Sequence, residues 1–192
     1  MIEQFLPANW QLLEHGKRAY AHSHMVTNVA QKNASHTSEL DVNKAYKYGL
    51  MHDIGKFYLS KLELYKHPRV GYELLINSYP DIAVICLTHP FPDFSNYEHV
   101  LSYHHEDENE ARKVFELLGK IEKNIYIELI QFCDKISRMD DYIRWEDKLQ
   151  WYLETYNLDP NEITHQYSKH LKKIKQKLDE LTNMDIYNLV GI

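Results

Sequence analysis

Hydrophobic residues along the chain recur with the spacing of α-helices rather than with the alternation of β-strands. From Lys17 to Ala34, the apolar side includes Val26, Val29 and Ala30, and a spacing of three or four residues places such positions on one helical face. No segment of convincing length alternates between apolar and polar residues as a strand does. The pattern therefore predicts an all-α fold.

Proline, glycine and capping residues indicate where several helices begin or end. Gly55 is expected to end the second helix, as glycine often does just beyond a helix. Pro68 and Pro80 suit the first turns of two later helices, and residues 159–162 (Asp-Pro-Asn-Glu) are typical of a helix N-terminus. The helices predicted from these signals cover residues 17–34, 42–53, 81–88, 110–118 and 124–138, with further helices opening at 67, around 145–153, and from the 159–162 cap to about 181.

Residues 89–109 form a stretch with turn residues and no clear period, so we expect an irregular and functional loop. Its aromatic residues have two interpretations. They can stack on a nucleobase, or they can pack the loop onto the domain. The residues concerned are Phe91, Phe94, Tyr97 and Tyr103.

The segment 124–138 is the most apolar of the predicted helices and is expected to be central. Residues 1–140 are predicted to form the core, with residues 141–192 as C-terminal helices packed on it in one domain. The basic run Lys169 to Lys177 is interpreted as a solvated face, because Leu171, Ile174 and Leu178 form a normal buried stripe beside it.

Composition narrows the class of protein. The chain has 192 residues and a net charge of −6 with neutral histidines, which disfavours a partner such as long nucleic acid. Cys86 and Cys133 lie in apolar segments and are expected to be reduced, as in the cytosol. The first ten residues have no basic start and no long apolar run, and no stretch has the length of a membrane span. We therefore expect a cytoplasmic protein without a membrane partner. The sequence does not determine the oligomeric state, and a homodimer is one of the alternatives.

Twelve histidines are many for this length, and their placement suggests chemistry. His52 and Asp53 are adjacent, so on a helix they point about 100° apart and could share an ion only near a helix end. Gly55 places them there, and Lys56 adds a cation suited to a phosphate oxygen. A lysine after a helix end is also favoured without any function.

Two further residues could join this pair from other helices. His22 falls in line with the apolar positions Val26 and Ala30, although a histidine there is often a satisfied core residue. Asp134 lies inside the most apolar segment, where a carboxylate needs a cation or a metal as partner. His24 is a rival to His22, and His36 is expected at the surface.

These residues in this order resemble the HD superfamily. Its motifs are matched by His22-Ser23 with Val26 and Ala30, by Leu50, His52-Asp53, Gly55 and Lys56, and by Asp134-Lys135 after Cys133. The resemblance covers about residues 17 to 140. It implies an HD-domain helical bundle with a C-terminal helical extension, and a site of His22, His52, Asp53 and Asp134 around a divalent metal.

Two more histidines resemble ligands of two-metal members of this superfamily. His67-Pro68-Arg69-Val70-Gly71 is similar to their His-Pro-x-x-Gly motif, and His89 follows where those members carry the next histidine. The Gly-Tyr-Pro signature of the HD-GYP branch is absent, which argues against a cyclic dinucleotide substrate. His104 and His105 are interpreted as surface residues. The alternative, that one of these side chains reaches the site from the loop, is left open.

The expected function is metal-assisted hydrolysis of a small phosphorylated substrate, with a nucleotide favoured. One or two divalent ions would be needed, and Fe, Mn, Mg, Co, Ni and Zn all suit such ligands. Asp53 and Lys56 are the predicted catalytic residues, and Lys56 and Arg69 the predicted substrate contacts. The alternative is a non-catalytic, metal-stabilised module that binds a ligand or a partner for regulation.

Overall fold

The computed structural model of the chain describes residues 2–105, 107–155 and 162–192. Helices dominate these residues, and their only β-structure is an isolated bridge between Ser137 and Tyr142. The predicted all-α fold is confirmed. None of the described helices combines the length and hydrophobicity needed to cross a bilayer.

The elements follow one another closely along the chain. The N-terminal elements are η1 (Ile2–Phe5), η2 (Trp10–Leu12), α1 (Glu14–Ala34), α2 (Val42–Met51), η3 (Ile54–Tyr58), η4 (Lys61–Lys66), α3 (His67–Leu75) and α4 (Pro80–Thr88), where η marks a 3-10 helix. The later ones are α5 (Tyr97–Tyr103), α6 (Glu108–Leu118), α7 (Ile125–Ile136), α8 (Trp145–Thr155), α9 (Glu162–Thr182) and α10 (Ile186–Val190).

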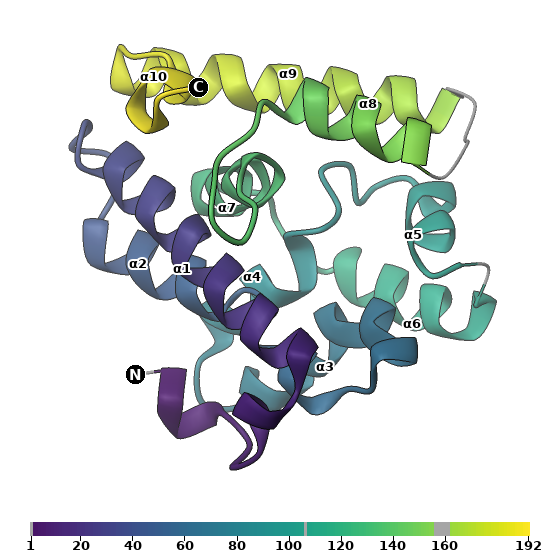
Figure 1. Cartoon of the computed structure of the whole chain (residues 1–192). Coiled ribbons are helices and arrows are strands. Elements are labelled where there is room, and N and C mark those ends of the chain that lie inside the picture. Colours follow the sequence, from purple (N-terminus) through teal and green to yellow (C-terminus); the bar gives the residue numbers. More distant parts are fainter. Residues whose placement is uncertain (1, 106, 156–161) are drawn as a thin grey trace.

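Helix α7 lies at the centre of the molecule, as its apolar sequence predicts. Leu129, Ile130 and Phe132 are fully buried. The helix contacts α1, α2 and α4 as well as α8 and α9, and Figure 1 shows it between these two groups. A side chain on α7 can therefore reach the interior from a fixed position.

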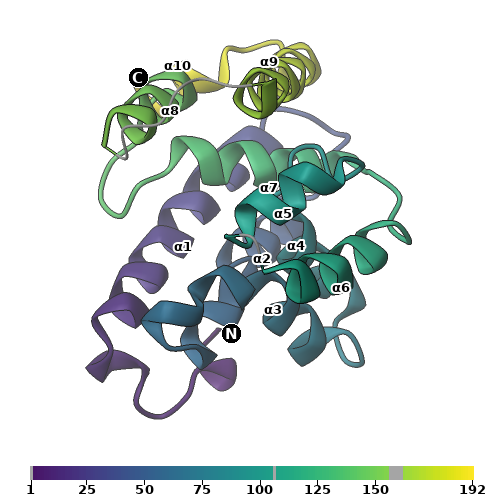
Figure 2. The same ribbon diagram turned by 90° about the vertical axis from the view of Figure 1, so that its right-hand side faces the viewer.

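Helices α8, α9 and α10 lie along one side of the molecule in both views (Figures 1 and 2). The stripe of Leu171, Ile174 and Leu178 is buried, while most lysines of the 169–177 run are exposed, which confirms the solvated basic face. The domain boundary at residue 140 stays a prediction. The capping residues 159–161 lie outside the described residues.

The stretch predicted to be irregular contains a helix. Helix α5 occupies residues 97–103, and the Asn96 side chain accepts a hydrogen bond from the backbone of Glu98 at its start. Seven residues are too few to establish a helical period in the sequence. Phe91 and Phe94 are buried in the core, so these two rings pack the segment onto the domain and are not available to stack on a base.

The prediction that Gly55 ends the second helix is wrong. Helix α2 ends at Met51, and Gly55 lies inside η3 without a left-handed backbone. A Cβ atom at Gly55 would lie 2.2 Å from the carbonyl oxygen of His67 and 2.7 Å from the nitrogen of Gly71. Glycine is needed here because η3 packs directly on the backbone of α3.

The remaining differences concern helix ends and one short helix. Helix α1 begins at Glu14 rather than at Lys17, and α7 ends at Ile136 rather than at Arg138. The short α10 was not predicted, although Asp185 caps its start by accepting from the backbone of Tyr187. Boundaries of this kind depend on frayed ends and caps more than on hydrophobic period.

Candidate metal centre

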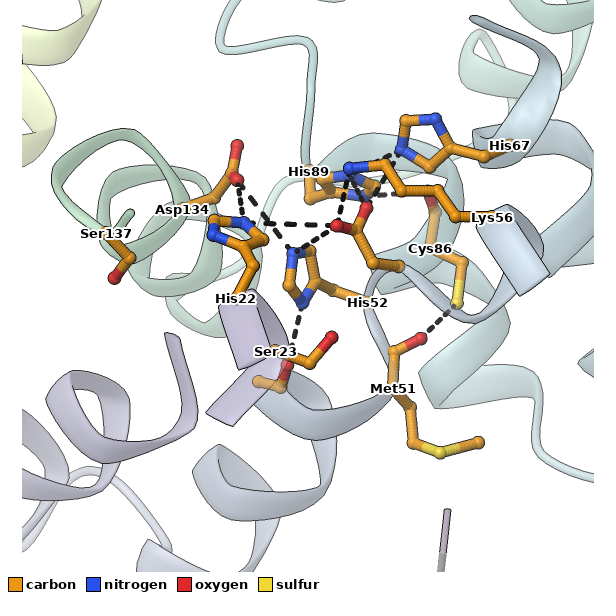
Figure 3. Close-up of polar contacts among 12 residues, drawn as sticks. His22, Ser23, Met51, His52, Lys56, His67, Cys86, His89, Asp134 and Ser137 are labelled. Carbon is orange, nitrogen blue, oxygen red and sulfur yellow. Dashed lines mark hydrogen bonds and ion pairs between the residues drawn. The ribbon is translucent and has the colours of Figure 1, made fainter. Parts of the chain in front are cut away.

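Five separate segments bring the predicted metal-binding side chains together (Figure 3). Helix α1 and helix α7 contribute one residue each from their interiors, and the others stand at helix ends, directly after α2, at the start of α3 and directly after α4. Helix ends let the backbone turn, so that adjacent residues can face one centre. The residues are His22, His52, Asp53, His67, His89 and Asp134.

The carboxylate of Asp53 links the two halves of this cluster. Its Oδ2 atom lies 3.5 Å from Nε2 of His52 and 3.9 Å from Nε2 of His22. Its Oδ1 atom lies 3.1 Å from Nε2 of His67 and 3.3 Å from Nε2 of His89. The carboxylate is fully buried, so its two oxygens face two different pairs of histidines.

Asp134 completes the first half from α7. Its Oδ1 atom lies 2.9 Å from Nε2 of His22 and 3.9 Å from Nε2 of His52. Two overlapping groups have ligand atoms within 4.8 Å of one another, His22 with His52 and Asp134, and His52 with Asp53 and His89. Both groups have the composition of sites for divalent metal ions.

Backbone carbonyls fix which ring nitrogen faces the centre. The Nδ1 atoms of His52 and His67 each lie 2.7 Å from a carbonyl oxygen, of Gly49 and Leu64, and Nδ1 of His89 lies 2.9 Å from that of Cys86. A carbonyl oxygen only accepts, so Nδ1 carries the hydrogen. In the neutral ring the lone pair is then on Nε2, which points inward, as in histidines that bind metals.

Burial sets the protonation of the cluster. It lowers the pKa of His52 to about 3, and together with the charge of Lys56 it lowers the pKa of His67 to about 4. Burial alone would raise the pKa of Asp53, but Lys56 and His52 hold it well below its usual range. At neutral pH His52 and His67 are therefore neutral beside the charged carboxylate of Asp53.

Three lysines surround the carboxylates. Lys56 places Nζ 2.5 Å from Oδ2 of Asp53, and Lys135 places Nζ 2.6 Å from Oδ2 of Asp134. Lys148, on α8, donates to the carbonyl oxygens of Asp134 and Ser137, at 3.2 and 2.9 Å. Burial lowers the pKa of Lys148 to about 8, opposed by Asp134 and reinforced by the charges of Lys135 and Lys56. The position of Lys148 could not be predicted from the sequence, because only the packing of α8 on α7 brings it here.

The guanidinium group of Arg69, predicted to contact a substrate, forms ion pairs with two carboxylates of the chain. Its guanidinium donates to Glu110 at 2.6 and 3.0 Å and to Glu73 at 2.6 Å. Glu110 is buried, so this ion pair joins α3 to α6. The predicted substrate contact of Arg69 stays a prediction that this geometry does not favour.

The paired histidines after α5 differ from each other. His104 is fully buried, which corrects its interpretation as a surface residue. Its Nδ1 lies 2.6 Å from the carbonyl oxygen of Val100. Its ring stacks on that of Phe91. His105 is exposed, and Glu106 lies outside the described residues. Neither histidine belongs to the metal-compatible groups.

The rival of His22 on α1 faces elsewhere. His24 is half-buried with its ring 4.6 Å from that of Tyr20, so it does not join the cluster. His36 is exposed, as predicted. The alternatives left open on α1 are therefore reduced to His22.

Two supporting contacts, of Gln131 and of Tyr103, were not predicted from the sequence. Gln131 donates to the carbonyl oxygens of Thr88 and Phe91, at 2.9 and 2.7 Å, and so ties the backbone around His89 to α7. The hydroxyl of Tyr103 lies 3.3 Å from Nδ1 of His67. Their positions depend on tertiary packing, which hydrophobic period does not reveal.

Comparison with known protein families identifies the domain that carries the centre. The model of a family described as HD domain matches residues 19–139. The matched segment contains the six histidine and aspartate residues of the centre, and it ends before α8, α9 and α10. No curated protein and no solved structure matches the chain.

Proposed function

Because the chain belongs to the HD domain family, we propose that it is a metal-dependent phosphohydrolase cleaving a phosphate ester or anhydride of a small molecule. The observation that carries the proposal is the inward direction of Nε2 in three buried rings whose Nδ1 atoms are held by backbone carbonyls. A nucleotide is the favoured substrate, because a net charge of −6 disfavours longer nucleic acids.

His52 provides a test of whether a metal ion fits the centre. Its Nε2 atom is buried and makes no hydrogen bond to the described residues. A buried nitrogen without a partner is costly, and the nearby oxygens of Asp53 and Asp134 are acceptors that cannot satisfy its lone pair. A divalent cation satisfies all three groups, so the residues fit such an ion.

Two ions sharing Asp53 account best for the distances. The first would be held by His22, His52, Asp53 and Asp134, and the second by Asp53, His67 and His89. Imidazole and carboxylate donors suit several first-row metals and also Mg²⁺, so the donor set does not single out one element.

The protein's own residues have distinct tasks around such ions. When bound, divalent cations supply an activated water and offset the charge of phosphate oxygens. Asp53 keeps its charge in the interior and fixes the separation between the two histidine pairs. Lys56, with 27% of its side chain exposed, can donate to a phosphate oxygen once Asp53 binds cations. The burial of the histidines keeps bulk water away from the reacting groups.

Turnover tests this proposal directly. Purified protein with Mn²⁺ is assayed against nucleoside mono-, di- and triphosphates and a generic phosphomonoester. We expect hydrolysis of at least one compound, reduced by more than about a hundredfold in His52→Ala and Asp53→Ala because each removes a metal ligand. His36→Ala, at an exposed position, is the matched control and should keep full activity.

Two outcomes would contradict the proposal. Bound metal without turnover of any compound would favour the alternative, a regulatory module that binds a ligand without cleaving it. Full activity in either His52→Ala or Asp53→Ala would mean that the reaction takes place elsewhere.

A further inference from the structure

Ammonium groups lie beside both carboxylates of the metal centre. Lys56 contacts the carboxylate of Asp53, and Lys135 contacts the carboxylate of Asp134. Lys148 donates to the backbone carbonyl of Asp134. Figure 3 shows Asp134 on one side of the cluster and Lys56 with His67 on the opposite side. The centre is therefore bounded by positive charge in two separate places.

Lys148 differs from the other two lysines in its partners. Among the described residues, no carboxylate lies within ion-pair distance of its Nζ atom, and its bonds go to the carbonyl oxygens of Asp134 and Ser137. These carbonyls belong to the end of α7, where a lysine is a common cap. An ammonium has three donors, so one N–H group remains after both bonds, in a half-buried position where an unpaired charge is unfavourable.

The balance of charge changes when metal ions bind. Lys56 and Lys135 are neutralised by the carboxylates that the proposed ions would take. Two carboxylates and three ammonium groups leave one net positive charge; one divalent ion raises it to three, and two raise it to five. A phosphomonoester brings only about two negative charges near neutral pH, fewer than the net positive charge of the metal-loaded centre. The ammonium groups of Lys135 and Lys148 beside Asp134 then remain without a counter-charge.

We propose that Lys148 binds the second phosphate group of the substrate, so that the centre recognises a chain of at least two phosphates, as in a nucleoside diphosphate or triphosphate. This inference rests on the proposed hydrolysis at the same centre and adds a substrate class to it. Lys56 binds the phosphate beside Asp53. Lys148 and Lys135 bind the next phosphate, beside Asp134.

The inference also assigns a role to the C-terminal helices. Lys148 lies beyond residues 19–139, the part that matches the HD domain. Helix α8 is anchored on α7 with Trp145 buried at its start. Substrate choice in this chain would thus depend on a segment outside the matched domain.

Binding of two simple anions tests the inference. Imidodiphosphate, a diphosphate analogue with a P–N–P link, and inorganic phosphate are each titrated calorimetrically into the full-length protein, with equal Mn²⁺ in both solutions. We expect imidodiphosphate to bind at least about tenfold more tightly than phosphate, since a charge-assisted hydrogen bond has an effect of this order. Lys148→Met should remove most of this difference and change phosphate binding by less than about twofold.

Controls separate recognition from folding. Lys32→Met removes another lysine whose Nζ donates to a backbone carbonyl, that of Leu189 at 3.3 Å, and should leave both affinities unchanged. Should Lys148→Met fail to fold, Lys135→Met tests the same end of the centre and should reduce the same preference.

The outcomes distinguish this inference from the proposed function. Equal binding of both anions by the wild type, or an equal loss for both anions in Lys148→Met, overturns the second-phosphate site and leaves hydrolysis untouched. If neither anion binds to the metal-loaded protein, the proposed function is overturned as well.

Discussion

At the scale of single residues, the centre depends on how Asp53 is surrounded. Each of its oxygens faces a different pair of histidine Nε2 atoms, within 3.1 to 3.9 Å. Lys56 balances the charge of the carboxylate while metal is absent. A buried carboxylate and several buried rings are costly without such partners, and the arrangement could hold a metal ion.

The metal-free protein should lose stability as the pH falls from about 6.5 towards 4. The folded state keeps His52 at a pKa of about 3 and His67 at about 4, whereas unfolded histidine has a pKa of about 6.5. Below about pH 6.5 the unfolded state therefore binds more protons than the folded state. The free energy of unfolding has its full value above this range and decreases as the pH falls through it. Urea unfolding after EDTA treatment should show a loss of about 2 to 4 kcal/mol between pH 7 and pH 5.

The matched variants for this measurement are His52→Gln and His36→Gln. His52→Gln should reduce the pH dependence, because it removes one of the two buried rings whose pKa is lowered. His36→Gln should leave it unchanged, because the residue is exposed. Equal free energies of unfolding at both pH values in the wild type would show that these rings are not held neutral by burial.

Much of the candidate site could be predicted because its ligands stand in short, specific patterns. His52-Asp53, the spacing of His22 from Val26 and Ala30, and a lone Asp134 in an apolar segment are visible in the sequence. Lys148 was not predictable, because its role comes from the packing of α8 beside the end of α7. The contact of Arg69 with Glu110 was missed for the same reason, since Glu110 approaches from a distant segment.

At the scale of elements, two glycines bring the ligand-bearing segments close. Gly55 in η3 lies against the backbone of His67 and Gly71, and a Cβ atom at Gly71 would lie 2.9 Å from Cβ of Cys86 in α4. Contacts this short join η3, α3 and α4 almost backbone to backbone. The three elements carry or border Lys56, His67 and His89, so their separation sets the geometry of the second half of the centre.

Gly55→Ala should destabilise the protein by about 2 kcal/mol or more, because the added methyl group overlaps backbone atoms that cannot move independently. Thermal or urea unfolding measures the change. Gly119→Ala is the control, since a Cβ atom there meets nothing closer than 3.6 Å and should change stability by less than about 0.5 kcal/mol. Similar stabilities of the two variants would contradict the close packing of η3 on α3.

The elements themselves were predictable where hydrophobic period was long. Helix α7 and the start of α3 were predicted because an apolar run and a His-Pro pair indicate them directly. Helix α5 was missed because it is short, although Asn96 was available as its cap. Gly55 was misinterpreted because a glycine that allows close packing and one that ends a helix look alike in sequence.

At the scale of the whole molecule, one hydrophobic core joins the matched domain to the C-terminal helices. Buried residues from α1, α2, α4 and α7 continue into Leu171, Ile174 and Leu178 of α9 and Ile186 of α10. Such a shared core is expected to unfold in one cooperative transition. The C-terminal helices then contribute to the stability of the domain that holds the centre.

Leu178→Ala should therefore lower the stability of the whole chain by about 2 to 5 kcal/mol through loss of buried contacts. The loss should be equal when followed by helical circular dichroism and by aromatic fluorescence. Leu62→Ala is the control, because Leu62 is 87% exposed and should change stability by less than about 0.5 kcal/mol. Two separate transitions in the wild type would contradict a single cooperative core.

The most direct test of the account is the metal stoichiometry of the EDTA-treated protein after titration with Mn²⁺ and removal of free ions. We predict two ions per chain in the wild type, one in His67→Ala, and none in Asp53→Ala, whose carboxylate would contribute to both sites. A wild-type protein that retains no metal, or an Asp53→Ala variant that retains the wild-type amount, would contradict the central claim that these histidines and aspartates form a metal centre.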